Sequence, residues 1–92
     1  MGAVAASIRR KLEEAFAPTE LDIIDDSDRH AGHAGARPGG ESHFRVSIVA
    51  AAFTGKSRIE RQRLVFSVLA DELRGPVHAL SLSTRAPGED AT

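Results

Sequence analysis

Residues 42–82 read SHFRVSIVAAAFTGKSRIERQRLVFSVLADELRGPVHALSL, and this stretch contains most of the pattern that decides the fold. Near its start, Phe44, Val46 and Ile48 alternate with polar residues. A two-residue hydrophobic period is typical of a strand with one buried and one exposed face. The beginning of the stretch therefore predicts a β-strand.

A helix is predicted next in the same stretch. Ser57 is followed three residues later by Glu60, the spacing of a capping box, in which the two side chains satisfy free amides at a helix start. Gly75 and Pro76 then end the helix, because proline cannot continue the backbone hydrogen bonds. The apolar residues between these signals form one broad predicted stripe: Ile59, Leu64, Val65, Val68, Leu69 and Leu73.

A further strand is predicted over residues 77–83. Within it, His78 has the same parity as Leu80 and Leu82, so we expect these three side chains to point to one face. A long helix between this strand and the previous one favours a parallel, right-handed connection.

Two elements are predicted before the stretch. Apolar residues recur at helical spacing over residues 4–16, and Pro18 ends that helix. Leu21, Ile23 and Ile24 form a short strand, which we expect to pair with the strand around Val46 as a hairpin. The connection is a polar, flexible loop over residues 25–42, DDSDRHAGHAGARPGGES, a length that compact domains rarely keep without a use.

The element order is helix, strand, strand, helix, strand, which is an α+β (αββαβ) arrangement. It predicts a three-stranded mixed sheet with the helices packed on one face. Residues 1–92 are expected to form a single domain, with a frayed tail over residues 85–92.

Composition excludes several functional classes. The 92 residues are 41% hydrophobic and 27% charged, values of an ordinary globular domain. The net charge of -1 argues against strong non-specific nucleic-acid binding. The absence of cysteine excludes disulfides and a self-contained cysteine-ligated iron-sulfur site. No apolar run is long enough to span a membrane, and we expect a cytoplasmic location.

The histidines are the first candidate for chemistry, because imidazole is the commonest protein metal ligand. His30 and His33 have an H-x-x-H spacing in the polar loop, His43 lies at the loop exit, and His78 opens the last strand. The residues alone leave two interpretations open: a convergent metal site, or solvated loop histidines with a hydrogen-bonded histidine at a strand end.

Two sets of charged residues and one loop motif are weaker candidates for a functional site. TGKS at residues 54–57 resembles the end of a phosphate-binding loop, but Ala50 occupies the position where that motif needs glycine. Asp25, Asp26 and Asp28 lack the ligand spacing of a calcium loop. The start of the second helix has a positive face that could meet phosphates or an acidic partner, formed by Lys56, Arg58, Arg61 and Arg63.

Three blocks in order resemble signatures of the BolA family: DDSDRHAGHAGARPGGESHFRVSIV, then FTGKS with RQRLV, then ELRGPVHALSL. The resemblance covers nearly the whole chain. It implies an αββαβ fold akin to the type II KH domain, in agreement with the element order derived from the residues.

The resemblance also implies a function. Such a chain is a non-enzymatic partner of monothiol glutaredoxins, and the heterodimer shares a [2Fe-2S] cluster to which glutaredoxin and glutathione contribute thiolates. The resemblance implies His78 as one ligand and His30 as the loop ligand, with His33 as its alternate. His43 is interpreted as supporting the site or the strand rather than ligating the cluster.

A DNA-binding regulator is the alternative, because some BolA-like proteins are linked to transcriptional control. Gly55 to Arg58 lacks the second glycine of the GXXG loop with which KH domains clamp nucleic acid. If DNA binds, the basic start of the second helix is expected to contact it. Homodimerisation is left open, and a mononuclear metal hydrolase ranks last because it lacks a general base.

Overall fold

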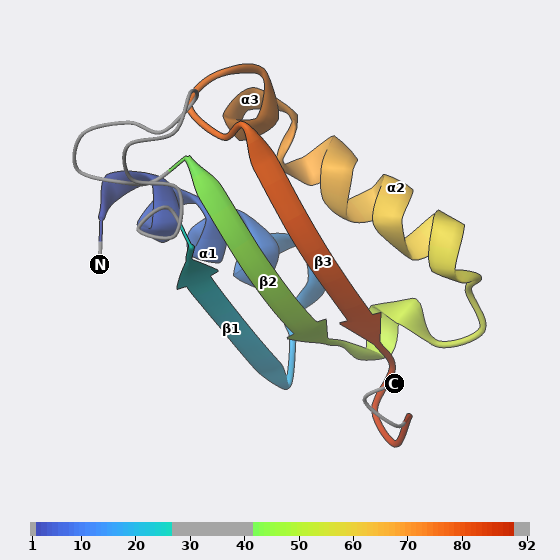
Figure 1. Ribbon diagram of the computed structural model, residues 1–92. Helices are drawn as coiled ribbons and strands as arrows, with labels where there is room; N and C mark the ends of the chain where they lie inside the picture. The colour runs from blue at the N-terminus through green and yellow to red at the C-terminus, as the bar shows by residue number, and fades with distance from the viewer. Residues whose placement is uncertain (1, 27–41, 90–92) are drawn as a thin grey trace.

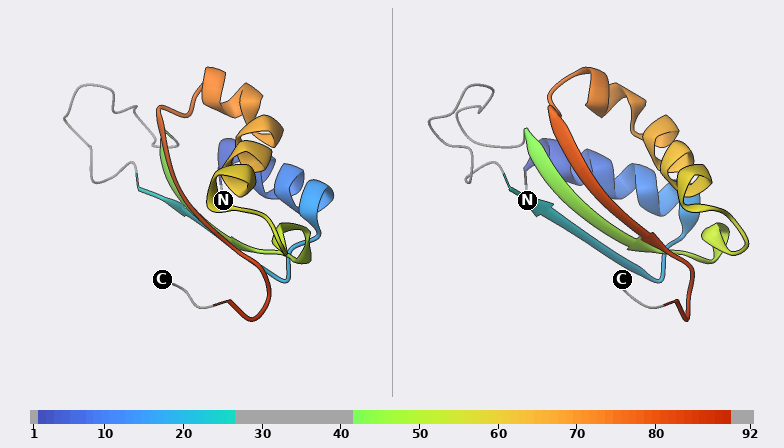
Figure 2. Two further views of the ribbon diagram at one scale, coloured as in Figure 1. Left: turned by 90° about the vertical axis from the view of Figure 1, so that its right-hand side faces the viewer. Right: turned by 45° about the vertical axis from the view of Figure 1, so that its right-hand side comes forward.

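The computed structural model describes residues 2–26 and 42–89. β1 pairs with β2 antiparallel and β2 pairs with β3 parallel, giving the strand order β1-β2-β3. The helices cover one face of this sheet (Figures 1 and 2), so the predicted α+β fold with a mixed sheet is confirmed. The elements follow one another as α1 (Ala3–Phe16), β1 (Glu20–Asp25), β2 (His43–Val49), η2 (Ala51–Phe53), α2 (Arg58–Val68), α3 (Ala70–Arg74) and β3 (Ala79–Arg85).

The core lies between the helices and the sheet, and the strand alternation explains how the sheet contributes to it. Phe44, Val46 and Ile48 of β2 are buried, whereas Arg45 between them is exposed. This is the pattern that the two-residue period predicts. From the helices and connections the core receives the following residues: Ala5, Ile8, Leu12, Ala50, Phe53, Val65, Leu69, Val77 and Ala86.

α1 forms as its sequence predicts. Ile8 and Leu12, four residues apart, are both buried on the face toward the sheet. Ala17 follows the helix in the left-handed conformation, with φ of 45°, and Pro18 prevents a further turn. In the part of the chain that the structure describes, no helix is long and apolar enough to cross a membrane.

The start of α2 confirms the capping box. The backbone N–H of Glu60 donates to Ser57 Oγ at 3.1 Å, and the backbone N–H of Ser57 donates to Glu60 Oε1 at 2.8 Å. The hydrogen bond from the Ser57 backbone is the main reason that the pKa of Glu60 lies below its usual value. Gly55 just before the helix has φ of 77°, a conformation that favours glycine.

The inward face of this helical region differs from the predicted stripe. Arg61, Val65 and Leu69 are buried, whereas Ile59 is 59% exposed and Leu64 is also exposed. The first three lie four residues apart and share one side of the helix, and Ile59 lies about 160° around the helix from Arg61. The helix is also divided at Leu69, so that α3 continues as a separate short element.

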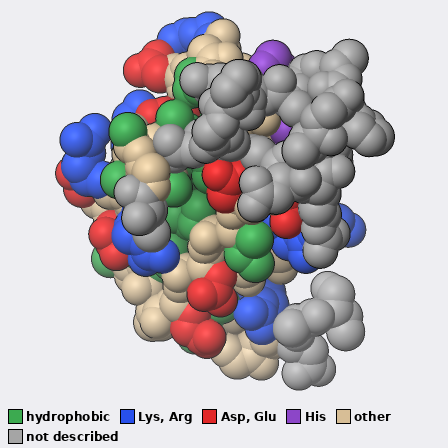
Figure 3. All heavy atoms as spheres, turned by 60° about the vertical axis from the view of Figure 1, so that its left-hand side comes forward, with side chains coloured by type: hydrophobic (Ala, Val, Ile, Leu, Met, Phe, Trp, Pro, Cys, Tyr) green, Lys and Arg blue, Asp and Glu red, His purple; other side chains and the backbone are tan. Residues whose placement is uncertain are grey.

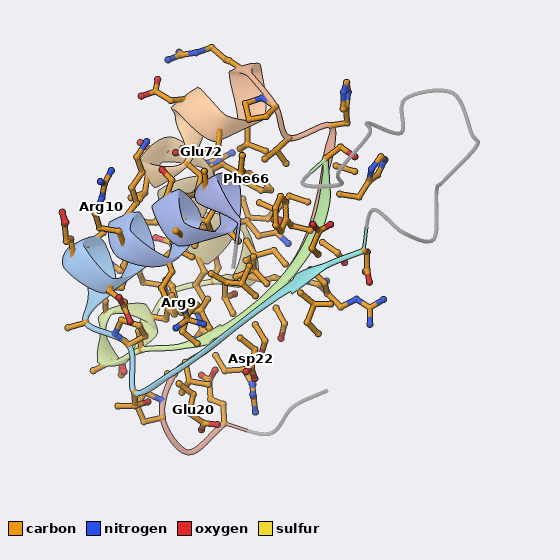
Figure 4. The ribbon with its side chains drawn as sticks, turned by 90° about the vertical axis from the view of Figure 1, so that its left-hand side faces the viewer. Arg9, Arg10, Glu20, Asp22, Phe66 and Glu72 are labelled. Carbon is orange, nitrogen blue, oxygen red and sulfur yellow. The ribbon has the colours of Figure 1, made fainter. Side chains whose placement is uncertain are left out.

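Glu72 of α3 forms a buried ionic link to α1. Its carboxylate accepts hydrogen bonds from Ser7 Oγ at 2.7 Å and from Lys11 Nζ at 3.0 Å. Burial raises the pKa of Glu72, but the hydrogen bonds from Lys11 and Ser7 outweigh it, and the pKa lies below its usual value. Figure 4 shows Glu72 where α3 meets α1, so this link holds the two helices together across the top of the core.

The last strand and the tail correct two predictions. β3 begins at Ala79, so His78 precedes the strand; it is exposed, unlike Leu80 and Leu82, which are partly buried against the core. The tail was predicted to fray from residue 85, but Arg85 belongs to β3 and Ala86 is buried. Residues 90–92 lie outside the described part.

The predicted loop over residues 25–42 is shorter at both ends. Asp25 is the last residue of β1, paired with Phe44, and Ser42 is fully buried beside β2. Residues 27–41, which include His30 and His33, lie outside the described residues.

Candidate functional site

One edge of the sheet brings together residues that are far apart in the sequence. β1 ends there because it runs antiparallel to β2, and β2 and β3 both begin there because they are parallel. The backbone N–H of Asp26 donates to the carbonyl oxygen of His43 at 2.8 Å, and that of His78 donates to the carbonyl oxygen of Ser42 at 2.7 Å. Both attachment points of the segment 27–41 therefore lie at the edge where β3 begins.

Two of the four histidines meet at this edge. The rings of His43 and His78 have centroids 6.2 Å apart, with 26° between their planes. His78 is exposed and His43 is half-buried, and histidine atoms, drawn purple, reach the molecular surface in Figure 3. The Nδ1 atom of His43 lies 2.8 Å from Oγ of the buried Ser42, a hydrogen bond that orients the imidazole.

The predicted ligand set is only partly within the described residues. His78 and His43 are placed together, whereas His30 and His33 lie outside the described part. Within residues 2–26 and 42–89, no group of three or more His, Cys, Asp or Glu side chains could hold a metal ion. Because the chain has no thiolate, a metal centre that used these two imidazoles would need further ligands from elsewhere.

The basic start of α2 is smaller than predicted. Lys56, Arg58 and Arg63 are exposed, as a surface for anions requires. Arg61 is 9% exposed and is directed inward, so the prediction that it belongs to the positive face is wrong. Its guanidinium donates to the carbonyl oxygens of Lys56 at 3.0 Å and Thr84 at 3.3 Å.

Arg61 also forms a bidentate ion pair with Glu89. The two Nη atoms lie 2.6 and 2.9 Å from the carboxylate oxygens, and the backbone N–H of Ala86 donates to the same carboxylate at 2.8 Å. The hydrogen bond from Arg61 is the main cause that lowers the pKa of Glu89 to about 2, followed by the hydrogen bond from Ala86. We name this arrangement of Arg61, Ala86 and Glu89 the C-terminal clip.

The sequence did not indicate the structural roles of two residues, Ser42 and Glu89. Ser42 was treated as the end of a loop, and Glu89 as part of a frayed tail. Ser42 contacts the adjacent His43 through its side chain and accepts a hydrogen bond from the distant His78 backbone, and Glu89 pairs with Arg61, 28 positions away. A buried serine directly before a histidine has no periodic signal that could have marked it.

Comparisons with known proteins agree with the fold. A family model described as BolA-like protein matches residues 12–89. Human BolA-like protein 1 is 47% identical over 89 residues, which cover 97% of this chain and 62% of that protein. The chain thus spans less than two thirds of this relative.

A solved structure and a bacterial relative extend the comparison. The structure described as the BolA domain of SufE1 from Arabidopsis thaliana superposes with a TM-score of 0.86 at 43% identity, covering 98% of this chain and 99% of that one. The DNA-binding transcriptional regulator BolA of Escherichia coli (strain K12) is 46% identical over 77 residues, 84% of this chain and 70% of that protein. With its fold, its motifs and these matches in agreement, the chain belongs to the BolA-like family.

Proposed function

We propose that this chain is a non-enzymatic partner of a monothiol glutaredoxin and shares a [2Fe-2S] cluster with it. His78 is one ligand, His30 is the loop ligand and His33 is its alternate. Glutaredoxin and glutathione supply the thiolates that this chain lacks. The cytoplasmic location stays a prediction from the sequence.

The observation that carries this proposal is the position of His78. Its imidazole is exposed at a sheet edge, and its backbone N–H donates to Ser42, where the segment containing His30 and His33 rejoins the fold. His30 follows Asp26 by four residues, which span at most about 14 Å when extended. This length sets an upper limit on the distance between the His30 backbone and Asp26, at the end of β1.

The donor set also supports a shared centre rather than a self-contained one. A [2Fe-2S] cluster takes four protein or thiol ligands, and imidazoles in place of thiolates raise its reduction potential. This chain's part is to present neutral imidazole nitrogens from a rigid strand end. The backbone hydrogen bond of His78 fixes the distance between that strand end and the start of β2.

The first prediction is a change in the visible spectrum. When a monothiol glutaredoxin carrying its [2Fe-2S] cluster is titrated with this protein, we expect new visible absorption and circular dichroism bands. His78→Ala should abolish these bands without lowering the melting temperature, because the side chain is exposed. Ser81→Ala is the matched control, because Ser81 is also exposed and lies in β3, three residues after His78; this variant should behave like wild type.

The loop ligand is tested in the same titration. His30→Ala should weaken the new bands, and the double variant with His33→Ala should remove them. No spectral change with the wild-type protein, or an unchanged spectrum with His78→Ala, would contradict the proposal.

DNA binding is the second candidate function, supported by the similarity to the Escherichia coli regulator and by the exposed Lys56, Arg58 and Arg63. Replacing Arg58 and Arg63 with Glu should weaken DNA binding. The slope of log affinity against log salt concentration should also become less steep, by the amount expected for the loss of about two phosphate contacts. Arg10 and Arg74 are exposed elsewhere, so replacing both with Glu gives the same change in net charge as a control. Equal affinity of the two double variants for a DNA duplex in a fluorescence anisotropy titration would remove this candidate.

A further inference from the structure

β3 is an edge strand of the sheet, and only one side of its backbone is paired with β2. At its two ends, the N–H of Ala79 and the carbonyl oxygen of Arg85 form hydrogen bonds on the side of β2, at 3.3 and 3.0 Å. Because the direction of the backbone groups alternates along a strand, three residues direct theirs away from β2: Leu80, Leu82 and Thr84. Within the described part of the chain, Arg61 donates to the carbonyl oxygen of Thr84 at 3.3 Å, and the other outward groups have no protein partner.

The two edges of the sheet differ in charge. β1, at the opposite edge, has three carboxylates among its six residues: Glu20, Asp22 and Asp25. Charged side chains on an edge strand hinder its pairing with another strand. β3 reads ALSLST over residues 79–84 and has no charged residue before Arg85. β3 is therefore the edge whose composition permits a further strand to pair.

The start of α2 forms a wall beside this edge. A surface hollow of about 270 Å³ lies between the helix and the strand, and its lining residues are Arg58, Leu82, Ser83 and Thr84. Figures 1 and 2 show α2 extending past the edge of β3 on the helix face of the sheet. Extended peptides add a strand to an exposed sheet edge in several recognition domains. We propose that β3 accepts an extended segment of a partner protein as an additional strand, and that an acidic side chain of this segment pairs with Arg58.

The charge at the hollow selects the acidic side chain. Arg58 is exposed, and it has no ionic partner among the residues that the structure describes. The nearby carboxylate of Glu60 accepts a hydrogen bond from the backbone of Ser57 and is therefore already engaged. Lys56 and Arg63, also exposed, add to the positive charge of this helix start. In strand addition the backbone hydrogen bonds give affinity and the side-chain contacts give specificity, so Arg58 determines which segments bind best.

The shape of this edge favours a single segment over a second copy of the chain. Pairing of β3 with β3 of a second copy requires a two-fold axis perpendicular to the joined sheet. Both copies of α2 would then extend past the joint on the same face of that sheet, and each would meet the other molecule's helices. A single extended segment carries no helix of its own and avoids this conflict.

The test is a nuclear magnetic resonance titration of the nitrogen-15-labelled chain with two short blocked peptides of alternating valine and threonine. The peptides differ at one position, which is glutamate in one and lysine in the other. Both should shift the amide signals of Leu80, Leu82 and Thr84 and slow their hydrogen exchange. The glutamate peptide should bind roughly two- to fivefold more tightly at low salt, the effect of one exposed ion pair.

Two variants separate the charge contact from the strand pairing. Arg58→Glu should reverse the order of the two peptides, whereas Arg10→Glu, an exposed change of the same charge on α1, should keep the wild-type order. Thr84→Pro removes an outward N–H without removing a hydrogen bond to β2, so it should weaken both peptides alike. The amide spectrum shows whether this proline variant is folded, and the Arg58 comparison does not depend on it.

Absence of shifts at the β3 amides with the glutamate peptide would overturn the inference. An unchanged order of the peptides with Arg58→Glu would overturn the pairing with an acidic side chain. Shifts of the β3 amides by a DNA duplex, but by neither peptide, would assign this edge to nucleic acid and would also overturn the inference. None of these readings involves glutaredoxin or a metal, so they are independent of the cluster titration.

Discussion

Phe53→Ala is expected to lower the free energy of unfolding by about 3 to 5 kcal/mol, the range for truncating a fully buried phenylalanine. Phe53 has no exposed surface, and its ring lies 5.1 Å from that of Phe16, at 44°. It occupies η2, between the end of β2 and the start of α2. The cavity would therefore open where the sheet, α1 and α2 meet.

This loss is large relative to the stability of a domain of this size. A domain of about 90 residues is expected to have a free energy of unfolding of about 5 to 10 kcal/mol, so Phe53→Ala removes a third or more of it. Urea denaturation followed by circular dichroism measures the change. Phe66→Ala is the matched control, because Phe66 is 39% exposed on α2 and its loss should be clearly smaller. Equal losses for the two variants would show that Phe53 is not a central core residue.

Local sequence signals predicted the elements that depend on neighbours along the chain. The alternation of Phe44, Val46 and Ile48 predicted β2 because the pleat alone assigns their face. The pair Ser57 and Glu60 predicted the start of α2 because both cap hydrogen bonds form within four residues. These features need no information about distant parts of the molecule.

The inward face of α2 could not be predicted in the same way. A hydrophobicity pattern places Ile59 inside and Arg61 outside, but the structure has the reverse. Arg61 is buried because the carbonyl oxygen of Thr84 and the carboxylate of Glu89, both distant in sequence, satisfy its guanidinium. Only the path of the chain after β3 reveals these partners.

The candidate site was likewise only partly predictable from local sequence. The sequence marked all four histidines, but it placed His78 inside a strand with Leu80 and Leu82. The structure places it before β3, with its ring beside His43. That meeting depends on the parallel register of β2 and β3, which no local pattern specifies. The loop ligand His30 stays a prediction.

The burial of Arg61 changes the test of DNA binding. A variant carrying Arg61→Glu would place a second carboxylate against Glu89 and remove the hydrogen bonds to Lys56 and Thr84. Weaker DNA binding by that variant could then arise from a displaced tail. Arg58 and Arg63 change the surface charge while leaving the C-terminal clip intact.

The C-terminal clip itself predicts how stability depends on pH. The pKa of Glu89 falls from 4.5 to about 2 in the folded protein. A carboxylate with a lowered pKa contributes stability that is fully present above its unfolded pKa and is lost as the pH falls toward its folded pKa. The contribution of Glu89 is therefore expected to be complete above about pH 5 and to disappear between about pH 5 and pH 2.

Glu89→Gln tests this dependence, because it keeps the size of the side chain and removes its charge. The wild-type protein should be the more stable at neutral pH, and the difference in free energy of unfolding should shrink steadily below about pH 5. Urea denaturation at a series of pH values measures the difference. Glu14→Gln is the control, since its contact with Arg10 at 4.0 Å is exposed and should give a small, nearly constant difference. A Glu89→Gln difference that is the same at acidic and neutral pH would mean that Arg61 does not hold Glu89 ionised, and the 86–89 turn would then owe its position to the burial of Ala86 alone.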